Sequence, residues 1–78
     1  MISKGLWKTE GGILFVLITK EVMKHLWEGV FYNMKGQKLS IGKWKDNGDY
    51  FMSDMPQYTL VERRRDGADK GGGWPNVP

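Results

Sequence analysis

Residues 30–62 read VFYNMKGQKLSIGKWKDNGDYFMSDMPQYTLVE, and this stretch decides the fold. Two turn sequences, Asn33-Met34-Lys35-Gly36 and Asp46-Asn47-Gly48-Asp49, separate short runs rich in aromatic and β-branched residues. Such runs, joined by glycine-containing turns, are typical of hairpins that follow one another along the chain. The stretch therefore predicts a small all-β meander or barrel.

The chain before residue 30 supplies two further strands. Residues 1–8 predict a first strand, and residues 9–12 predict a turn into the apolar run Ile13–Thr19. That run is short and rich in β-branched residues, which suits a central strand buried on both faces. Between Lys20 and Trp27 apolar residues pair at a spacing of four, which predicts one short helical turn or an irregular crossing.

One glycine is expected to bend a later strand. Leu39 and Ile41 lie in phase along their strand, whereas Trp44 is out of phase by one residue. Gly42 stands where the phase changes, and glycine inside a strand often marks a bulge. The sequence predicts a bulge or sharp bend at Gly42.

Proline then divides the last part of the fold. Pro56 has no backbone donor for a ladder, so Tyr50–Met52 and Tyr58–Val61 are either two short strands or one edge strand and its continuation. The count of strands is five. We place the boundary of the β domain at residues 1–62, followed by a basic and then Gly- and Pro-rich tail at 63–78, which we predict to be flexible.

The tail carries a lone tryptophan, Trp74, close to its end. Such a ring either docks on its own barrel or on a neighbouring subunit, or contacts another partner. We therefore predict Trp74 as an oligomer or partner contact and the protein as a homo-oligomer.

Composition limits the setting of the protein. The chain of 78 residues has a formal charge of +3, a pI near 9.3 and no cysteine. Small secreted domains usually carry disulfides, so a reducing, cytoplasmic location is predicted. The continuous apolar run Ile13–Ile18 is far shorter than the roughly 20 residues that cross a bilayer, so no membrane association is expected.

No arrangement of residues in the sequence predicts catalysis. His25 is the only histidine, and without cysteine it cannot complete a typical zinc site. Nine scattered carboxylates are most simply residues of a solvated surface. We predict a protein that is not an enzyme and that needs no cofactor or metal.

Aromatic and cationic side chains are the candidate binding residues. Rings can stack on a nucleotide base and arginines can contact phosphate. For an anionic nucleotide these candidates are Trp7, Trp27, Tyr32, Trp44, Arg63 and Arg64. The same rings would serve equally well as core.

A second set of cations predicts a different ligand. Lysines between positions 35 and 45 alternate with aromatic neighbours, a pattern that suits single-stranded nucleic acid. This nucleic-acid alternative uses Lys35, Lys38, Lys43, Lys45 and Arg65. Lysines on the outer face of a hairpin also discourage edge-to-edge growth of a sheet, which explains the same pattern without a ligand.

The order of these features resembles a recurring type of small bacteriophage and prophage accessory protein. In those chains a turn precedes an apolar strand, and an Asp-Gly turn, a Tyr and a closing Asp-Leu-Val follow. The matching positions are 8–12, Leu14–Ile18, 28–30, 44–50 and 58–62. Thr59 stands where those chains often have Asp, and the connection 20–27 is longer.

The resemblance implies an SH3-like small barrel and a phage-encoded accessory product in the host cytoplasm. It implies no active site. The favoured function is a non-enzymatic inhibitor of a host or anti-phage defence component. It would bind either a host protein or a small anionic nucleotide signal. A small nucleic-acid-binding module and a virion or assembly component are the alternatives.

Overall fold

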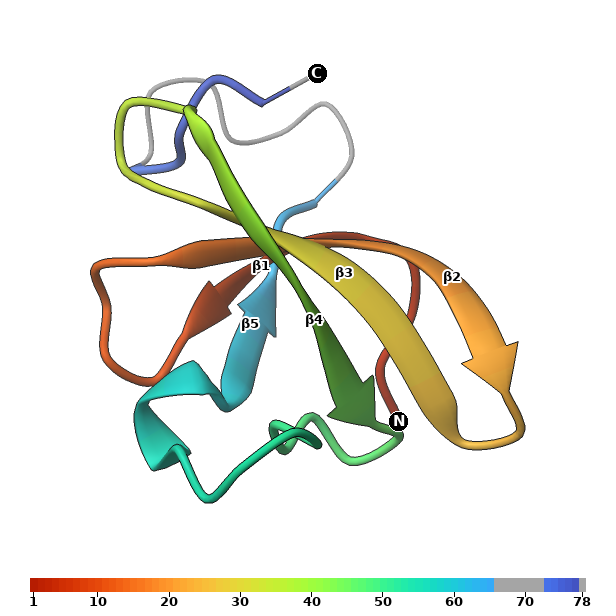
Figure 1. The fold of residues 1–78 in the computed structure, drawn as a ribbon. Coiled ribbons are helices and arrows are strands. Elements are labelled where there is room, and N and C mark those ends of the chain that lie inside the picture. Colours follow the sequence, from red (N-terminus) through yellow and green to blue (C-terminus); the bar gives the residue numbers. More distant parts are fainter. Residues whose placement is uncertain (66–72, 78) are drawn as a thin grey trace.

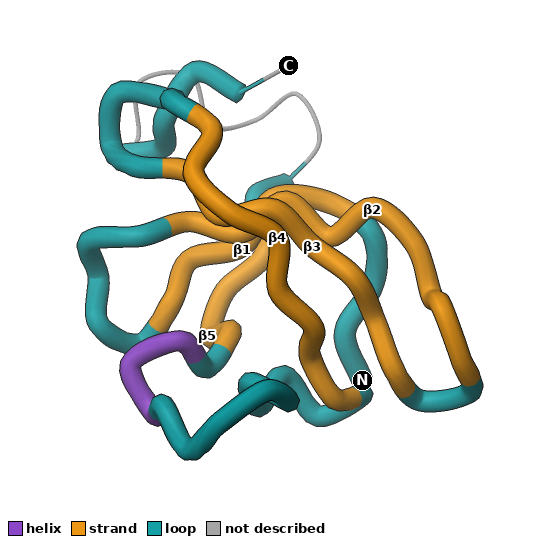
Figure 2. The backbone as a smooth tube through the Cα atoms, viewed as in Figure 1, coloured by secondary structure: helices purple, strands orange, loops and turns teal. Residues whose placement is uncertain are grey.

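The computed structural model describes residues 1–65 and 73–77, which form a small all-β unit (Figures 1 and 2). Its strands are β1 (Gly5–Thr9), β2 (Phe15–Met23), β3 (Leu26–Tyr32), β4 (Lys38–Lys45) and β5 (Leu60–Arg63), with one short 3-10 helix, η1 (Pro56–Tyr58). All neighbours are antiparallel, in the order β4-β3-β2-β1-β5. The five-stranded all-β prediction is confirmed, as an open meander whose last strand returns to the first.

Loop contacts bridge the two ends of this open sheet. The indole of Trp44 in β4 donates to the carbonyl of Tyr58 at 2.9 Å, just before β5. The Leu60 amide in β5 donates to the carbonyl of Gly48 at 3.0 Å, in the turn after β4. These bonds hold the 46–59 connection across the inner face of the sheet.

The predicted helical turn between Lys20 and Trp27 is wrong, because β2 continues to Met23 and turns directly into β3. A two-residue turn joins the strands, and His25 in it has a φ of 64°, a value that tight hairpin turns favour. Two register shifts interrupt the pairing along 18–23. The apolar residues spaced by four are not paired across the strands: Met23 pairs with Leu26, and Trp27 pairs with Glu21.

The predicted bulge at Gly42 is also wrong. Gly42 pairs regularly with Gly29, and the register shift lies further along, between the pairs Val30–Ile41 and Tyr32–Lys38. Gly42 and Trp44 simply face inward, whereas Ile41 faces outward. A Cβ on Gly42 would lie 2.8 Å from the Trp44 ring, so the glycine provides room for that ring.

The segment around Pro56 forms less strand than predicted. Tyr50 makes only an isolated bridge to Trp44, and no strand covers Tyr50–Met52. Pro56 opens η1, where its fixed φ and missing donor are tolerated, and β5 begins at Leu60. Because β5 ends at Arg63, the sheet extends one residue beyond the predicted boundary at 62.

The inner face of the sheet holds the main core. Its buried members come from the N-terminus and from four strands: Ile2, Val16, Ile18, Phe31, Trp44 and Leu60. Trp44 is fully buried, and its ring meets Phe31 edge-on at 5.1 Å and Tyr50 at 5.3 Å between centroids. Aromatic packing of this kind stabilises small cores beyond the area that it buries.

A second cluster lies on the outer face, under the C-terminal segment 73–77. Leu6, Phe15 and Val77 are buried there, with Leu17, Tyr32 and Trp74 packed around them. In Figure 1 this segment lies beside the turn between β3 and β4, and Asn76 approaches Gly36 in that turn. The predicted flexible tail falls partly on residues 66–72 and 78, which lie outside the described residues.

Candidate binding surface

The structure does not bring the six nucleotide-site candidates together. Trp44 is in the core, where no ring face is open to a ligand. Trp7 and Trp27 pack partly against the inner core, and Tyr32 lies on the outer face. Rings on opposite faces of one sheet cannot stack on the same base.

The candidate arginines lie beside β1. The Arg63 guanidinium donates from Nε to the carbonyl of Lys4 at 2.8 Å and from Nη1 to that of Arg64 at 3.2 Å. The Arg64 amide donates to the carbonyl of Leu6 at 2.8 Å. These hydrogen bonds extend the pairing of β5 with β1, so Arg63 helps to fix β5 at the edge of the sheet.

The lysines of the nucleic-acid alternative lie on and around β4. Lys43 and Lys45 alternate with the inward residues and therefore face outward, and Lys38 is exposed where β4 begins. Lys35 is exposed in the turn before β4, and Arg65 is exposed beyond β5. Four of the five cations therefore lie on or beside β4, at one edge of the sheet. Arg65 lies just after β5, the strand at the opposite edge.

A row of apolar side chains crosses the same outer face. Leu6 pairs with Leu17, Leu17 with Val30, and Val30 with Ile41, so the row crosses β1, β2, β3 and β4. Its exposure rises along the row, from 2% at Leu6 to 56% at Ile41. Leu39 is also exposed, at 49%, but it lies within the register shift between Lys38 and Ile41 and is not part of this row. We call Leu17, Val30 and Ile41 the outer apolar row.

The C-terminal segment covers the other end of this face. The Trp74 ring packs on Phe15 with centroids 5.8 Å apart, and the Lys8 ammonium lies 4.7 Å from the Trp74 ring centroid. Val77 is buried in the same cluster. The tryptophan predicted as an oligomer or partner contact thus contacts its own sheet, and the segment stops short of Ile41.

Replacing Trp74 with alanine should loosen this cover. The variant loses an aromatic pair and a cation–π contact, worth together about 1–2 kcal/mol of the free energy of unfolding. Urea unfolding measures that loss, and hydrogen exchange of β1 and β2 amides locates it. Phe51→Ala, which removes an exposed ring in a loop, is the control and should change stability little. Equal losses in both variants would contradict the packing role.

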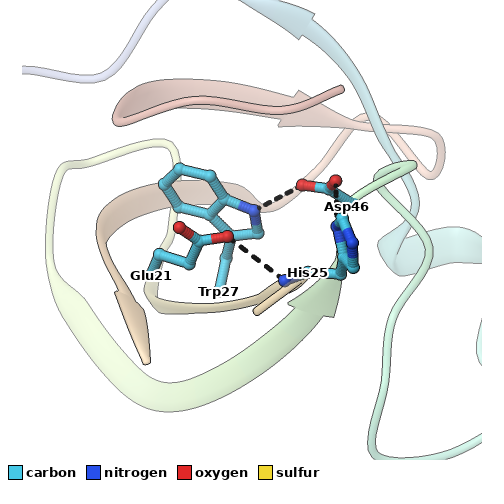
Figure 3. A network of polar contacts seen from close by, with 4 residues as sticks. All are labelled: Glu21, His25, Trp27 and Asp46. Atoms are coloured by element: carbon cyan, nitrogen blue, oxygen red, sulfur yellow. Dashed lines mark hydrogen bonds and ion pairs between the residues drawn. The ribbon is translucent and has the colours of Figure 1, made fainter. Parts of the chain in front are cut away.

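A polar network fastens the β2–β3 turn to the end of β4 (Figure 3). Asp46 accepts from the Trp27 indole at 2.8 Å and lies 2.8 Å from His25 Nδ1. The His25 amide donates to Glu21 at 3.2 Å, and the Asp46 amide donates to the His25 carbonyl at 3.1 Å. The hydrogen bond from Trp27, followed by that from His25, lowers the pKa of Asp46.

This network predicts how stability depends on pH. The pKa of Asp46 is lower in the folded protein than in the unfolded chain, so ionised Asp46 stabilises the fold fully at pH values above its unfolded pKa. That stabilisation is lost as the pH falls through the folded pKa. Asp46→Asn should therefore reduce stability at pH 7 and show a smaller further loss between pH 5 and 2 than the wild type. Urea unfolding at both ends of that range measures it, and Asp49→Asn is the control. Parallel acid curves for Asp46→Asn and wild type would contradict the role of Asp46.

Two clefts formed by the described residues are less suited to an anionic ligand than the nucleotide prediction requires. An open cleft of about 520 Å³ is lined by Lys45, Asp49, Tyr50, Phe51, Ser53, Asp54, Met55, Pro56 and Thr59. Two carboxylates there face one lysine, so a phosphate group would meet net repulsion. A second, apolar pocket of about 200 Å³ lies between the β1–β2 turn and η1. It is smaller than the usual small-molecule site.

Sequence reasoning missed the outer apolar row as a binding surface. The signal was present in part, because Ile41 is in phase with Lys43 and Lys45. The register shift between Lys38 and Ile41 takes Leu39 out of that phase. Among the described residues no three metal-binding side chains gather at one place, and no helix there is long and apolar enough to cross a membrane. Comparison with protein-family models, curated proteins and solved structures gives no match for this chain.

Proposed function

We propose that this protein is a non-enzymatic binding module that attaches to a partner protein through the outer face of β3 and β4. The observation that carries this proposal is the outer apolar row, which is covered at β1 and open at Ile41. Ile41 is about half exposed, and it lies on β4, the strand at one edge of the sheet.

Exposed apolar side chains favour a partner when they are contiguous and rimmed by charge. Scattered surface leucines are ordinary, but the row from Leu17 through Val30 to Ile41 is a continuous cross-strand ladder. Lys38, Lys43 and Lys45 border it. An apolar centre with a polar rim is the usual composition of a protein interface.

The protein partner is favoured over the nucleotide signal on geometric grounds. The rings proposed for stacking lie on different faces, and the larger cleft carries two carboxylates. Neither arrangement supports phosphate and base recognition in one place. The resemblance to phage accessory proteins adds the expectation of an inhibitor that works by stoichiometric binding to a host or defence protein.

The nucleic-acid alternative keeps one supporting observation. Lys20 on β2 and Lys43 and Lys45 on β4 face outward on either side of β3, and Glu28 on β3 lies between them, paired with Lys20 at 3.9 Å. Binding to a phosphate backbone would weaken steeply with added salt, whereas binding through the apolar row would change little. A salt titration of the isolated complex separates the two functions.

The experiment compares two matched substitutions of exposed isoleucines. Ile41→Asp places a charge in the outer apolar row, and Ile13→Asp places the same charge in the β1–β2 turn, at 72% exposure. Each variant is expressed with an affinity tag in bacterial cells under phage infection, and its fold is checked by thermal unfolding. We expect a stoichiometric partner to co-purify with wild type and Ile13→Asp but not with Ile41→Asp. Equal recovery by all three would contradict the proposal.

Self-association remains a prediction of the sequence. The apolar row could bind a second copy, which would make the partner the protein itself. Light scattering of the purified protein over a range of concentrations tests this. A homo-oligomer that Ile41→Asp dissociates would place the subunit interface on the outer face.

A further inference from the structure

Backbone hydrogen bonds show which residues of β4 face the edge of the sheet. The Phe51 amide donates to the Lys43 carbonyl at 2.9 Å, and the Lys45 amide donates to the Asp49 carbonyl at 2.8 Å. Both bonds come from the side opposite β3. In an antiparallel pair the residues that do not bond to one neighbour direct their amide and carbonyl groups to the other side. The backbone amide and carbonyl groups of Lys43 and Lys45 therefore point away from β3, toward the open edge of the sheet.

Ile41 follows the same alternation. It pairs in register with Val30, and the register shift begins only beyond this pair. The amide and carbonyl of Ile41, together with the amide of Lys43, thus point away from β3. Within residues 1–65 and 73–77 no hydrogen bond reaches these three groups. The described chain pairs with β4 at 43–45 and leaves 38–42 as an open strand edge.

We infer that this part of β4 accepts an extended, acidic segment of the partner protein as an added sixth strand. The inference rests on the proposed function and names the chemistry of the partner. Strand addition uses the backbone groups of an exposed edge for affinity and its alternate side chains for specificity. Here the backbone groups are those of Ile41 and Lys43, and the side chains are those of the outer face.

Charge selects an acidic segment over a second copy of β4. The strand carries Lys38, Lys43 and Lys45 and no acidic residue. Two copies paired edge to edge would bring six lysines together, and like charges on neighbouring strands are destabilising. A segment with an apolar residue opposite Ile41 and a carboxylate beside Lys43 satisfies both side chains. On β3, Glu28 lies opposite Lys43, but its carboxylate also forms an ion pair with Lys20.

Two decapeptides test the inference against the full-length, isotope-labelled protein. The acidic probe repeats the unit Val-Thr-Glu-Thr and the basic probe repeats Val-Thr-Lys-Thr, so that valine and the charged residue alternate along one face of the strand and can lie opposite Ile41 and Lys43. We expect the acidic probe to shift the amide resonances of Ile41 and Lys43 and to slow their hydrogen exchange. The basic probe should leave these resonances unchanged at the same concentration.

Two substitutions at one position separate backbone pairing from side-chain contact. Ile41→Pro removes the edge-facing amide without touching the bonds to β3, and proline is tolerated on edge strands in this orientation. Ile41→Ala keeps the amide and shortens the side chain. Strand pairing predicts that Ile41→Pro lowers the affinity for the acidic probe by roughly tenfold, and by more than Ile41→Ala does. Equal affinities for the two variants would overturn pairing through this edge.

Charge reversal supplies the second pair of variants. Lys43→Glu should abolish binding of the acidic probe, whereas Lys24→Glu, in the distant β2–β3 turn, should not. Resonance shifts that map to another surface, equal binding of the basic probe, or binding of an oligothymidylate in place of the acidic probe would overturn the inference. If both probes fail while Ile41→Asp still loses its cellular partner, the proposed function stands and strand addition fails.

Discussion

Replacing Trp44 with alanine is expected to bring the protein close to unfolding at 37 °C. The side chain is fully buried, packs on Phe31 and Tyr50, and donates a hydrogen bond to the Tyr58 carbonyl. Tryptophan-to-alanine changes in cores cost about 3–5 kcal/mol. A domain of this size is stable by roughly 4–12 kcal/mol, so the loss is a large share.

Urea unfolding followed by far-ultraviolet circular dichroism measures this effect. Trp7→Ala is the matched control, because Trp7 is a half-buried ring whose indole donates to the Ser3 carbonyl at 2.9 Å. We expect the midpoint to fall clearly further for Trp44→Ala than for Trp7→Ala. A smaller loss for Trp44→Ala would mean that Trp44 is not the centre of the inner core.

A side chain at Gly42 should also destabilise the inner core. A Cβ there would lie 2.8 Å from Cη2 of Trp44 and 3.0 Å from Cε1 of Tyr50, closer than ordinary contact allows. Gly42→Val forces both rings to move, and overpacking of this kind typically costs about 1–3 kcal/mol. The increased strand propensity of valine offsets only part of that cost.

Ser40→Val controls for the propensity of the new residue. Ser40 lies on the same strand and is exposed, so valine there should be neutral or slightly stabilising. Urea unfolding of both variants gives the comparison, and near-ultraviolet circular dichroism reports whether the aromatic cluster is displaced. If Gly42→Val were as stable as Ser40→Val, the glycine would not be required by ring packing.

The fold could be predicted where the signal is local. The turn at 33–37 is formed by Asn33, whose side chain accepts from the amides of Lys35 and Gln37 at 2.9 and 3.0 Å. Asn47 accepts from the Asp49 amide in the same way at 3.0 Å. Such turns depend on neighbours in the sequence, so the residues alone identify them.

The β2–β3 hairpin could not be predicted, because bulges disturb the periodicity of a strand. Register shifts between Ile18 and Lys20 and between Glu21 and Met23 break the alternation of faces. The remaining apolar residues then recur at the spacing of a helix. A tight turn brings residues of the same segment together across two strands, and only the register distinguishes the two structures.

The candidate site depends on information that is not local. The phase of Ile41 with Lys43 and Lys45 is visible in the sequence, but the row with Val30 and Leu17 requires the register of three strands. The position of Trp74 over Phe15 requires contacts between residues almost sixty positions apart. Aromatic residues could not be sorted into core and surface, because both faces of β3 pack against other side chains.

The most direct test of the outer apolar row places a photo-reactive benzophenone residue at one position at a time. Positions 41 and 43 lie on the outer face of β4, and position 10 is exposed in the β1–β2 turn. The protein is irradiated in infected bacterial cells and the products are identified by mass spectrometry. We predict that positions 41 and 43 cross-link to the same partner protein and that position 10 does not. A partner captured from position 10 alone, or none from 41 and 43, would contradict binding through β3 and β4.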